Sequence, residues 1–483
     1  MHPRRLFPIL AANKAMNKAI RFKLFVMMAL EFAIWGCWLP LIYQYLPSLG
    51  FSPGQQSWIL NAFPIAAVVG MFFSSQFADR HFSAERFLAF SHFVGGLAML
   101  GLAAIHAAAP VAGLEAGQPN PNAPFWPFFG LMLLYCLLYV PTISIANSIA
   151  FANLKDPQKE FGLLRVGGSI GWVLAAWPFT FILVDWNQVH STLAQWDSLH
   201  PGNPHGPVKW LGTVLASGLS GQPLQEGTRW TFVVAGIASL VLATHSLFLP
   251  HTPPKKVERG ADRLAWLEAV KLLKHPFVLV LWLVALTESF VIYSYFNWTS
   301  PFLGARPEAG GVGIGGNWIM PVMSLGQVAE MVAMLLLGAT LKRLGWRWTM
   351  VTGICAHIAL FSVYAFCPVA GAVILVQPLH GVCYAFFIAT VYIFVDEYFP
   401  KDVRSSAQGL FNAVILGLGS LAANSVCPHL MRKTFTHGGV TDFHSLFLIS
   451  VSGAALSALV LAFCFRPPPK KELAPPTEVA LAA

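Results

Sequence analysis

The chain has 483 residues, of which 56% are hydrophobic and 11% are charged. Soluble domains carry roughly 25% charged residues, so this composition excludes an ordinary soluble globular protein. The formal net charge of +9 would suit a nucleic-acid partner. However, the basic residues lie between long apolar runs, which predicts a lipid bilayer and no nucleic acid around the chain.

Apolar runs of roughly twenty residues recur along the chain, each long enough to cross a bilayer as a helix. They predict an all-α membrane protein with twelve transmembrane helices in two six-helix bundles. The predicted spans are centred, in chain order, near Trp35, Ala67, Leu97, Leu137, Leu174, Leu240, Val291, Val328, Ala359, Thr390, Leu418 and Ala455.

Five segments follow from the positions of these spans. They are an N-terminal bundle at 1–250 (with a cytoplasmic tail at 1–22 and an outer loop at about 185–228), a central loop at 251–276, a C-terminal bundle at 277–465 and a disordered Pro-rich tail at 466–483. We expect the outer loop to cap the outer mouth of the protein. With this arrangement twenty-five of the thirty Lys and Arg residues lie on one side of the membrane. The positive-inside rule makes that side cytoplasmic, so the sequence predicts a multi-pass protein of the inner membrane with both termini and the central loop in the cytoplasm.

The two halves of the sequence show a weak internal repeat. The second span ends in "FADRHFSAERF" (Phe77 to Phe87) and the eighth in "GATLKRLGWRW" (Gly338 to Trp348), each a short basic turn after the second span of its half. A chain of six plus six spans with related halves is typical of a transporter with two bundles. The layout resembles that of the major facilitator superfamily.

Enzyme motifs are nearly absent from the sequence. It holds no P-loop, HExxH or paired CxxC pattern, which predicts no cofactor, no metal and no enzyme activity. The letters "GGSIG" at 167–171 match the G-x-S-x-G pattern of serine hydrolases, and an intramembrane serine protease using Ser169 with His357 or His380 is a remote alternative. Small residues that let helices pack closely account for the same letters.

Polar side chains inside the apolar spans are the more informative signal. In "SLGQVAEMVAML", Gln327 and Glu330 share one helix face. A carboxylate inside a span costs about 2.5–3.5 kcal/mol on the mildest scales, which favours a functional role for Glu330. Glu31 in "ALEFAIWGCWL" is a second carboxylate inside a span.

Further polar and aromatic side chains share helix faces in both halves. Such faces suit a flat ligand that stacks between rings and forms hydrogen bonds. The candidates are Arg165, Ser169 and Trp172 in the fifth span, Tyr293, Phe296 and Asn297 in the seventh, and His380 and Tyr384 in the tenth.

Eight segments in order along nearly the whole chain resemble those of the nucleoside:proton symporters of the major facilitator superfamily. They are "EFAIWGCWL", "YVPTISIAN", "RVGGSIGW", "LPHTPPKK", "SLGQVAE", "HGVCYAFF", "RSSAQGLF" and "GGVTDF". The resemblance implies alternating access and nucleoside uptake driven by the proton gradient. It also implies substrate contacts at Arg165, Ser169, Trp172, Gln327 and Glu330.

The sequence departs from this family at three positions. Family members carry polar amides where Tyr293 and Phe296 stand, and an aspartate implicated in ligand binding or proton coupling where Ala385 stands. A permease or facilitator for another hydroxylated small molecule, such as a sugar or polyol conjugate, is therefore the nearest alternative. The preferred hypothesis is a monomeric secondary transporter that takes up nucleosides with protons, with Glu330 as first and Glu31 as second coupling residue.

Overall fold

The computed structural model describes residues 6–73, 83–109, 111, 118–154, 157–253, 270–399 and 401–466, without the side chains of 6–17, 70–73, 157–163 and 401–406. Three predicted features lie wholly or largely outside these residues: the central loop, the Pro-rich tail and the basic turn that ends the second span. The chain divides into two compact units. Unit 1 comprises 1–51, 69–256 and 315–324, and unit 2 comprises 52–68, 257–314 and 325–483.

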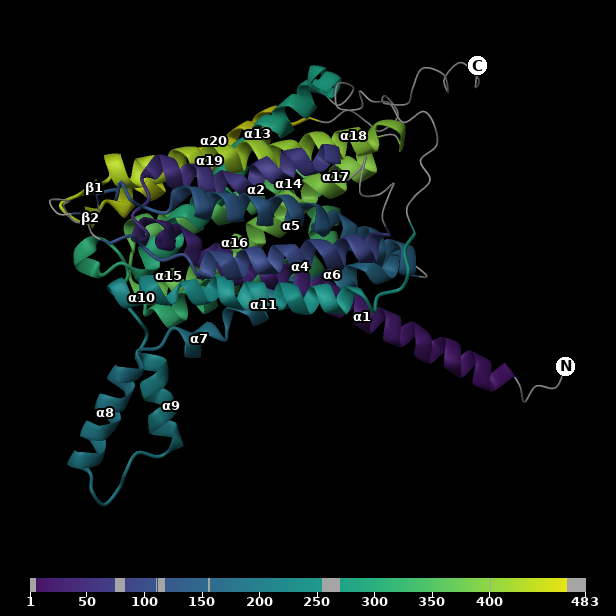
Figure 1. The fold of residues 1–483 in the computed structure, drawn as a ribbon. Coiled ribbons are helices and arrows are strands. Elements are labelled where there is room, and N and C mark those ends of the chain that lie inside the picture. Colours follow the sequence, from purple (N-terminus) through teal and green to yellow (C-terminus); the bar gives the residue numbers. More distant parts are fainter. Residues whose placement is uncertain are drawn as a thin grey trace, which may run out of the picture. The chain divides into compact units, whose positions relative to one another are not determined.

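Helices make up almost all the regular structure of unit 1 (Figure 1). They are α1 (Leu6–Ser48), α4 (Ala84–Ala103), α5 (Phe125–Asn153), α6 (Pro157–Ala176), α7 (Phe179–Ile182), α8 (Trp186–Leu199), α9 (Pro207–Ala216), α10 (Gly221–Gly227) and α11 (Arg229–Ser246). Two further helices, α2 (Pro53–Phe73) and α14 (Gly316–Phe366), have residues in both units.

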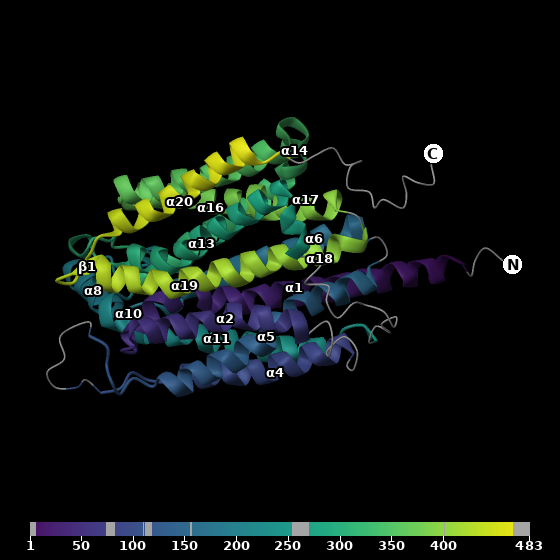
Figure 2. The ribbon, with the colours of Figure 1, turned by 90° about the horizontal axis from the view of Figure 1, so that it is seen from above.

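Small residues set the helix packing of unit 1. In Figure 2, α4 lies beside α5 and α11. A Cβ atom at Gly96 would stand 3.0 Å from the carbonyl oxygen of Gly236 on α11. Likewise, a Cβ at Gly171 on α6 would overlap the carbonyl oxygen of Ala29 on α1. Backbones can approach this closely only where a side chain is missing, as is usual between membrane helices.

The segment predicted as a long outer loop is instead largely helical. Figure 1 shows α8 and α9 as a hairpin that extends from unit 1. The Asp185 carboxylate accepts a hydrogen bond from the backbone N–H of Gln188 and so caps α8. Val189 and Leu193 of α8 are buried with Val214 of α9. The spacing of four residues between Val189 and Leu193 places them on one helix face, a short signal that the tryptophans and prolines of the segment obscured.

Unit 2 is also built almost wholly from helices. These are η3 (Leu272–Lys274), α13 (Pro276–Gly304), η4 (Pro307–Ala309), α15 (Ala370–Val376), α16 (Pro378–Cys383), η5 (Tyr384–Ala389), α17 (Thr390–Tyr398), α18 (Lys401–Asn412), η6 (Ala413–Leu418), α19 (Gly419–His429), η7 (Leu430–Thr434) and α20 (Phe443–Cys464). A two-stranded antiparallel ribbon, β1 (Thr436–His437) with β2 (Val440–Thr441), precedes α20. In Figure 2, α13 lies between α19 and α20.

The long helix α14 contains two of the predicted spans. Its backbone breaks at Gly345, where φ is 69° and ψ is 177°. This positive φ suits glycine, which has no Cβ to clash. At the basic turn predicted after the eighth span, the helix is therefore interrupted at a single residue, Gly345.

The class of fold agrees with the sequence, whereas the number of spans stays a prediction. All twelve predicted centres lie within helices. Among the residues described, nine helices are long and apolar enough to cross a membrane, with α14 counted as one.

Candidate functional site

Unit 1 buries a carboxylate and an imidazole against each other. Glu31 on α1 and His92 on α4 are 0% and 1% exposed, and Glu31 Oε2 lies 2.9 Å from His92 Nε2. The other carboxylate oxygen, Oε1, accepts a hydrogen bond of 2.7 Å from the Thr142 hydroxyl on α5. His92 Nδ1 lies 3.0 Å from the Ser239 hydroxyl on α11. Each side-chain oxygen of Glu31 and each ring nitrogen of His92 therefore has a partner.

The predicted residues of the fifth span lie on α6, where two of them contact aromatic rings of α1. The Arg165 guanidinium carbon stands 4.1 Å from the centre of the Phe32 ring, a cation–π geometry. Trp172 is 8% exposed and meets Trp35 edge-on, with 5.3 Å between ring centres. Ser169, one turn after Arg165, is half-buried. These residues join α6 to α1 close to Glu31.

Two of the three candidates in the seventh span form part of an aromatic cluster in unit 2. Phe296 lies 6.3 Å from Tyr293 between ring centres, and it meets His380 edge-on at 5.6 Å. The Asn297 amide donates to the Tyr293 carbonyl and to the Asn424 side chain on α19. Asn297 therefore uses its N–H groups within unit 2.

Helices α14 and α16 pack closely against each other at two glycines, Gly326 and Gly381. A Cβ at Gly381 would overlap the carbonyl oxygen of Gly326, so α16 and α14 are in direct backbone contact. Gln327 and Glu330 are half-buried, and Gln327 Oε1 accepts no hydrogen bond within the described residues. Tyr384, also half-buried, begins the π-helical segment η5.

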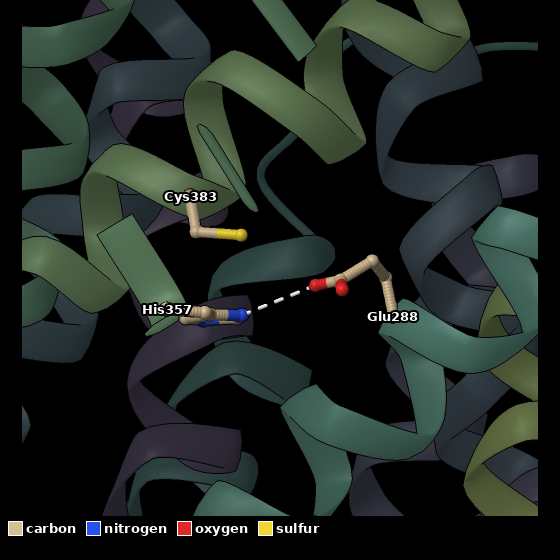
Figure 3. Close-up of side chains that lie close together, drawn as sticks. All are labelled: Glu288, His357 and Cys383. Carbon is tan, nitrogen blue, oxygen red and sulfur yellow. Dashed lines mark hydrogen bonds and ion pairs between the residues drawn. The ribbon is translucent and has the colours of Figure 1, made fainter. Parts of the chain in front are cut away.

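Unit 2 contains a second buried carboxylate–imidazole pair. Glu288 on α13 lies 3.3 Å from His357 on α14, between Oε2 and Nδ1, and both side chains are 0% exposed (Figure 3). His357 Nε2 is in turn 3.3 Å from His380 Nδ1. We call Glu288, His357 and His380 the unit 2 network.

Aromatic and amide groups fix the far end of this network. The His380 ring stacks on Tyr295, with 3.9 Å between ring centres. The Tyr295 hydroxyl donates to Gln377 Oε1 at 2.8 Å, and Gln377 Nε2 donates to the Tyr364 hydroxyl at 2.6 Å. His380 is thereby held between His357 and a ring whose own position is fixed.

Of the residues in the Glu31–His92 pair and the unit 2 network, sequence reasoning placed only Glu31 and His380 in the candidate site. From the sequence, His357 is only a candidate base of the protease alternative, and neither Glu288 nor His92 has a predicted role. A signal was available, because Glu31 and Glu288 lie in the first predicted span of each half, and His92 and His357 in the third. Ionisable residues inside spans are rare, so their recurrence at matching places is informative.

Figure 3 also shows Cys383 beside the pair. One ligand atom from each of Glu288, His357 and Cys383 lies within 4.8 Å of the other two. These are residue types that hold zinc. However, Glu288 and His357 already stand at hydrogen-bonding distance, and the described residues supply no fourth ligand to this group. The geometry suits a hydrogen-bonded network better than a closed metal site.

Comparison with known proteins gives the family. The family described as "Nucleoside H+ symporter" matches residues 16–197 and 206–470. The chain belongs to the nucleoside H+ symporter family. It is therefore a multi-pass membrane transporter and not an enzyme, and the serine protease alternative falls away.

Individual members and solved structures agree with this assignment. The chain is 29% identical to the putative nucleoside transporter YegT of Escherichia coli, covering 92% of this chain and 93% of YegT. It is 24% identical to the xanthosine permease of the same organism, covering 93% and 96%. A crystal structure of the nucleoside transporter NupG aligns with a TM-score of 0.70 at 21% identity, covering 93% and 100%. That likeness shows that this nucleoside H+ symporter has a fold of the major facilitator type.

Proposed function

We propose that the chain takes up nucleosides across the cytoplasmic membrane by proton symport with alternating access. Membership of the nucleoside H+ symporter family carries this proposal. The Lys and Arg distribution supports cytoplasmic termini. We propose further that the chain works as a monomer.

The candidate nucleoside contacts are of two chemical kinds. In unit 1, Arg165 and Ser169 offer hydrogen-bond donors, and Trp172 offers a ring face. A base stacked on an aromatic ring gains about 1–3 kcal/mol, which would account for Trp172 beside Trp35.

Unit 2 supplies amide, carboxylate and aromatic groups. Gln327 has an amide oxygen that accepts no hydrogen bond within the described residues, which leaves it ready for a ligand donor. Glu330, one turn later, can accept hydrogen bonds from ribose hydroxyls or carry a proton. Tyr293, Phe296, His380 and Tyr384 offer rings, while Asn297, whose amide is used within unit 2, would position Tyr293.

Glu330 remains the first candidate for proton coupling and Glu31 the second. The position of Glu330 supports it, because a group one turn from Gln327 can link substrate occupancy to protonation directly. Glu31 is fully buried whereas Glu330 is half-buried, which makes Glu31 the more confined of the two carboxylates.

Uptake by purified protein in liposomes tests this function. Wild type should accumulate at least one member of a nucleoside panel when an inward proton gradient is imposed. Glu330→Gln should exchange that nucleoside but lose accumulation and pH dependence, because glutamine does not titrate. Glu308→Gln, which changes an exposed carboxylate of η4, is the matched control and should behave as wild type.

Two results would contradict the proposal. Proton-driven accumulation by Glu330→Gln at the wild-type level removes Glu330 from coupling. Transport of sugar or polyol conjugates with no nucleoside transported supports the alternative permease.

A further inference from the structure

The unit 2 network differs from an ordinary buried ion pair in the number of hydrogen bonds that its carboxylate accepts. Glu288 Oε2 faces His357, but Glu288 Oε1 accepts no hydrogen bond within the described residues. The Ser457 hydroxyl on α20 faces the carboxyl group without completing a bond of ordinary geometry. A buried carboxylate that lacks donors is costly as an anion and much less so when it holds a proton.

The groups around Glu288 do not supply a fixed positive charge. His357 faces it from α14 and Cys383 from α16, and the exposed Cys355 of α14 interacts with it only electrostatically. Within the described residues, α20 contributes only the Ser457 hydroxyl, α19 and η6 contribute no titratable side chain, and no Lys or Arg pairs with Glu288. The charge of the network therefore changes with the number of protons it holds.

Two hydrogen bonds in series allow a proton to pass along this network. With both imidazoles neutral, His380 Nδ1–H donates to His357 Nε2, and His357 Nδ1–H donates to Glu288 Oε2. A proton that binds His380 Nε2 can then be balanced by two transfers, from His380 Nδ1 to His357 Nε2 and from His357 Nδ1 to Glu288 Oε2. One proton enters, Glu288 becomes neutral, and the net charge changes from −1 to 0.

The network also reaches the helix that carries Gln327 and Glu330. A Cβ at Gly326 would stand 3.3 Å from the His380 ring, so this ring packs directly against the α14 backbone. Gly326 precedes Gln327, and Glu330 follows one turn later. A shift of α14 around a bound ligand would therefore move the surroundings of His380.

We propose that the unit 2 network of Glu288, His357 and His380 is a second proton-binding element that loads and releases a proton during transport, acting together with Glu330. This inference rests on the proposed function as a proton symporter. It gives Glu288, rather than Glu31, the task of holding a proton in the interior.

The test compares Glu288→Gln with Glu85→Gln in liposomes, using the nucleoside that wild type transports best. Glutamine keeps the shape of a neutral Glu288 but can neither gain nor lose a proton. Glu85 is a matched control because it is also a buried carboxylate bonded to a histidine, with 2.8 Å between its Oε1 and His251 Nδ1, and no proposed site includes it.

The expected result follows from the driving force. A gradient of about one pH unit supports about ten-fold accumulation per coupled proton, since one unit corresponds to 1.36 kcal/mol. Wild type and Glu85→Gln should reach this level. Because the network and Glu330 act on the same coupled proton, Glu288→Gln should fall to about one-fold while still exchanging nucleoside across the membrane. Accumulation by Glu288→Gln equal to wild type overturns the inference.

Two further variants keep the test decisive. If Glu288→Gln does not fold, His357→Gln interrupts the path and should lose accumulation in the same way, whereas wild-type accumulation by this variant overturns the inference. Cys383→Ser should leave coupling intact. Loss of uptake in Cys383→Ser together with a zinc requirement of wild type would replace the proton network by a metal site.

Failure of the inference differs from failure of the proposed function. The behaviour of wild type alone tests whether the chain is a nucleoside:proton symporter. The ratio of each variant to wild type tests where a proton binds. A wild type that exchanges nucleosides without accumulating them contradicts symport before any variant is considered.

Discussion

The two buried Glu–His pairs have the same residue types but different surroundings. In unit 1, both oxygens of Glu31 and both nitrogens of His92 have partners, at 2.7 to 3.0 Å. In unit 2, Glu288 has one oxygen without a hydrogen bond within the described residues, and the contacts of His357 measure 3.3 Å. Common N–H···O distances are about 2.9–3.0 Å, so the second pair is held more loosely.

This difference separates a fixed pair from one that can change its charge. A fully bonded pair joins α1, α4, α5 and α11, and a change in its protonation would break bonds that hold four helices together. An incompletely bonded carboxylate loses less when it accepts a proton. Residue type alone therefore does not assign a role to a buried carboxylate, whereas the number of its donors does.

Removing the imidazole from each pair should give the largest difference in stability between the two units. His92→Leu leaves Glu31 with the Thr142 hydroxyl alone and should cost about 3–5 kcal/mol of stability, as when a buried ion pair loses one partner. His357→Leu should cost less, about 1–3 kcal/mol, because Glu288 can hold a proton instead. Thermal unfolding in detergent measures both. Equal losses would show that the two pairs are equivalent and would remove the basis of the comparison.

Filling the glycine contact beside His380 should have an intermediate effect. Gly381→Ala places a methyl group on the carbonyl oxygen of Gly326, and overpacking of this kind costs about 1–3 kcal/mol. The displacement of α16 from α14 should also reduce proton-driven accumulation. Gly130→Ala on α5, where the new Cβ meets no atom within 4 Å, is the control and should lower neither stability nor accumulation. A wild-type melting temperature for Gly381→Ala would mean that the two helices are not in close contact.

Removing the hydroxyl group beside each carboxylate should have the smallest effects on stability. The two variants should nevertheless differ clearly from each other. Thr142→Val removes the donor to Glu31 Oε1 and should cost about 1–2 kcal/mol, because a buried acceptor loses its partner. Ser457→Ala removes a hydroxyl that completes no hydrogen bond and should cost less than about 0.5 kcal/mol. Melting temperatures of the two variants, measured side by side, check this order. A larger loss for Ser457→Ala would place a strong hydrogen bond on Glu288 and weaken the proposal for the unit 2 network.

Sequence patterns predicted those features that depend on neighbouring residues. Helical spacing correctly brought Arg165 and Trp172 to the side of α6 that faces α1. Apolar length correctly gave a helical membrane protein, and all twelve predicted centres lie in helices. The resemblance in consecutive residues gave the family.

Contacts between segments that are distant in the sequence could not be predicted from local patterns. His92 lies 61 residues from Glu31, and His357 lies 69 residues from Glu288, so no local spacing connects them. The hairpin of α8 and α9 was missed because its apolar stripe is only a few residues long. Periodicity gives the face that a residue occupies but not the helix that packs against it.

The break at Gly345 has a consequence for how the chain is inserted into the membrane during synthesis. Lys342, Arg343 and Arg347 flank this glycine, and a single residue with φ of 69° separates the two helical segments of α14. Because the turn is so short, the first segment cannot complete its insertion into the bilayer before the second segment leaves the ribosome. The two segments should therefore enter the bilayer together as one helical hairpin, with the basic turn retained at the proposed cytoplasmic face.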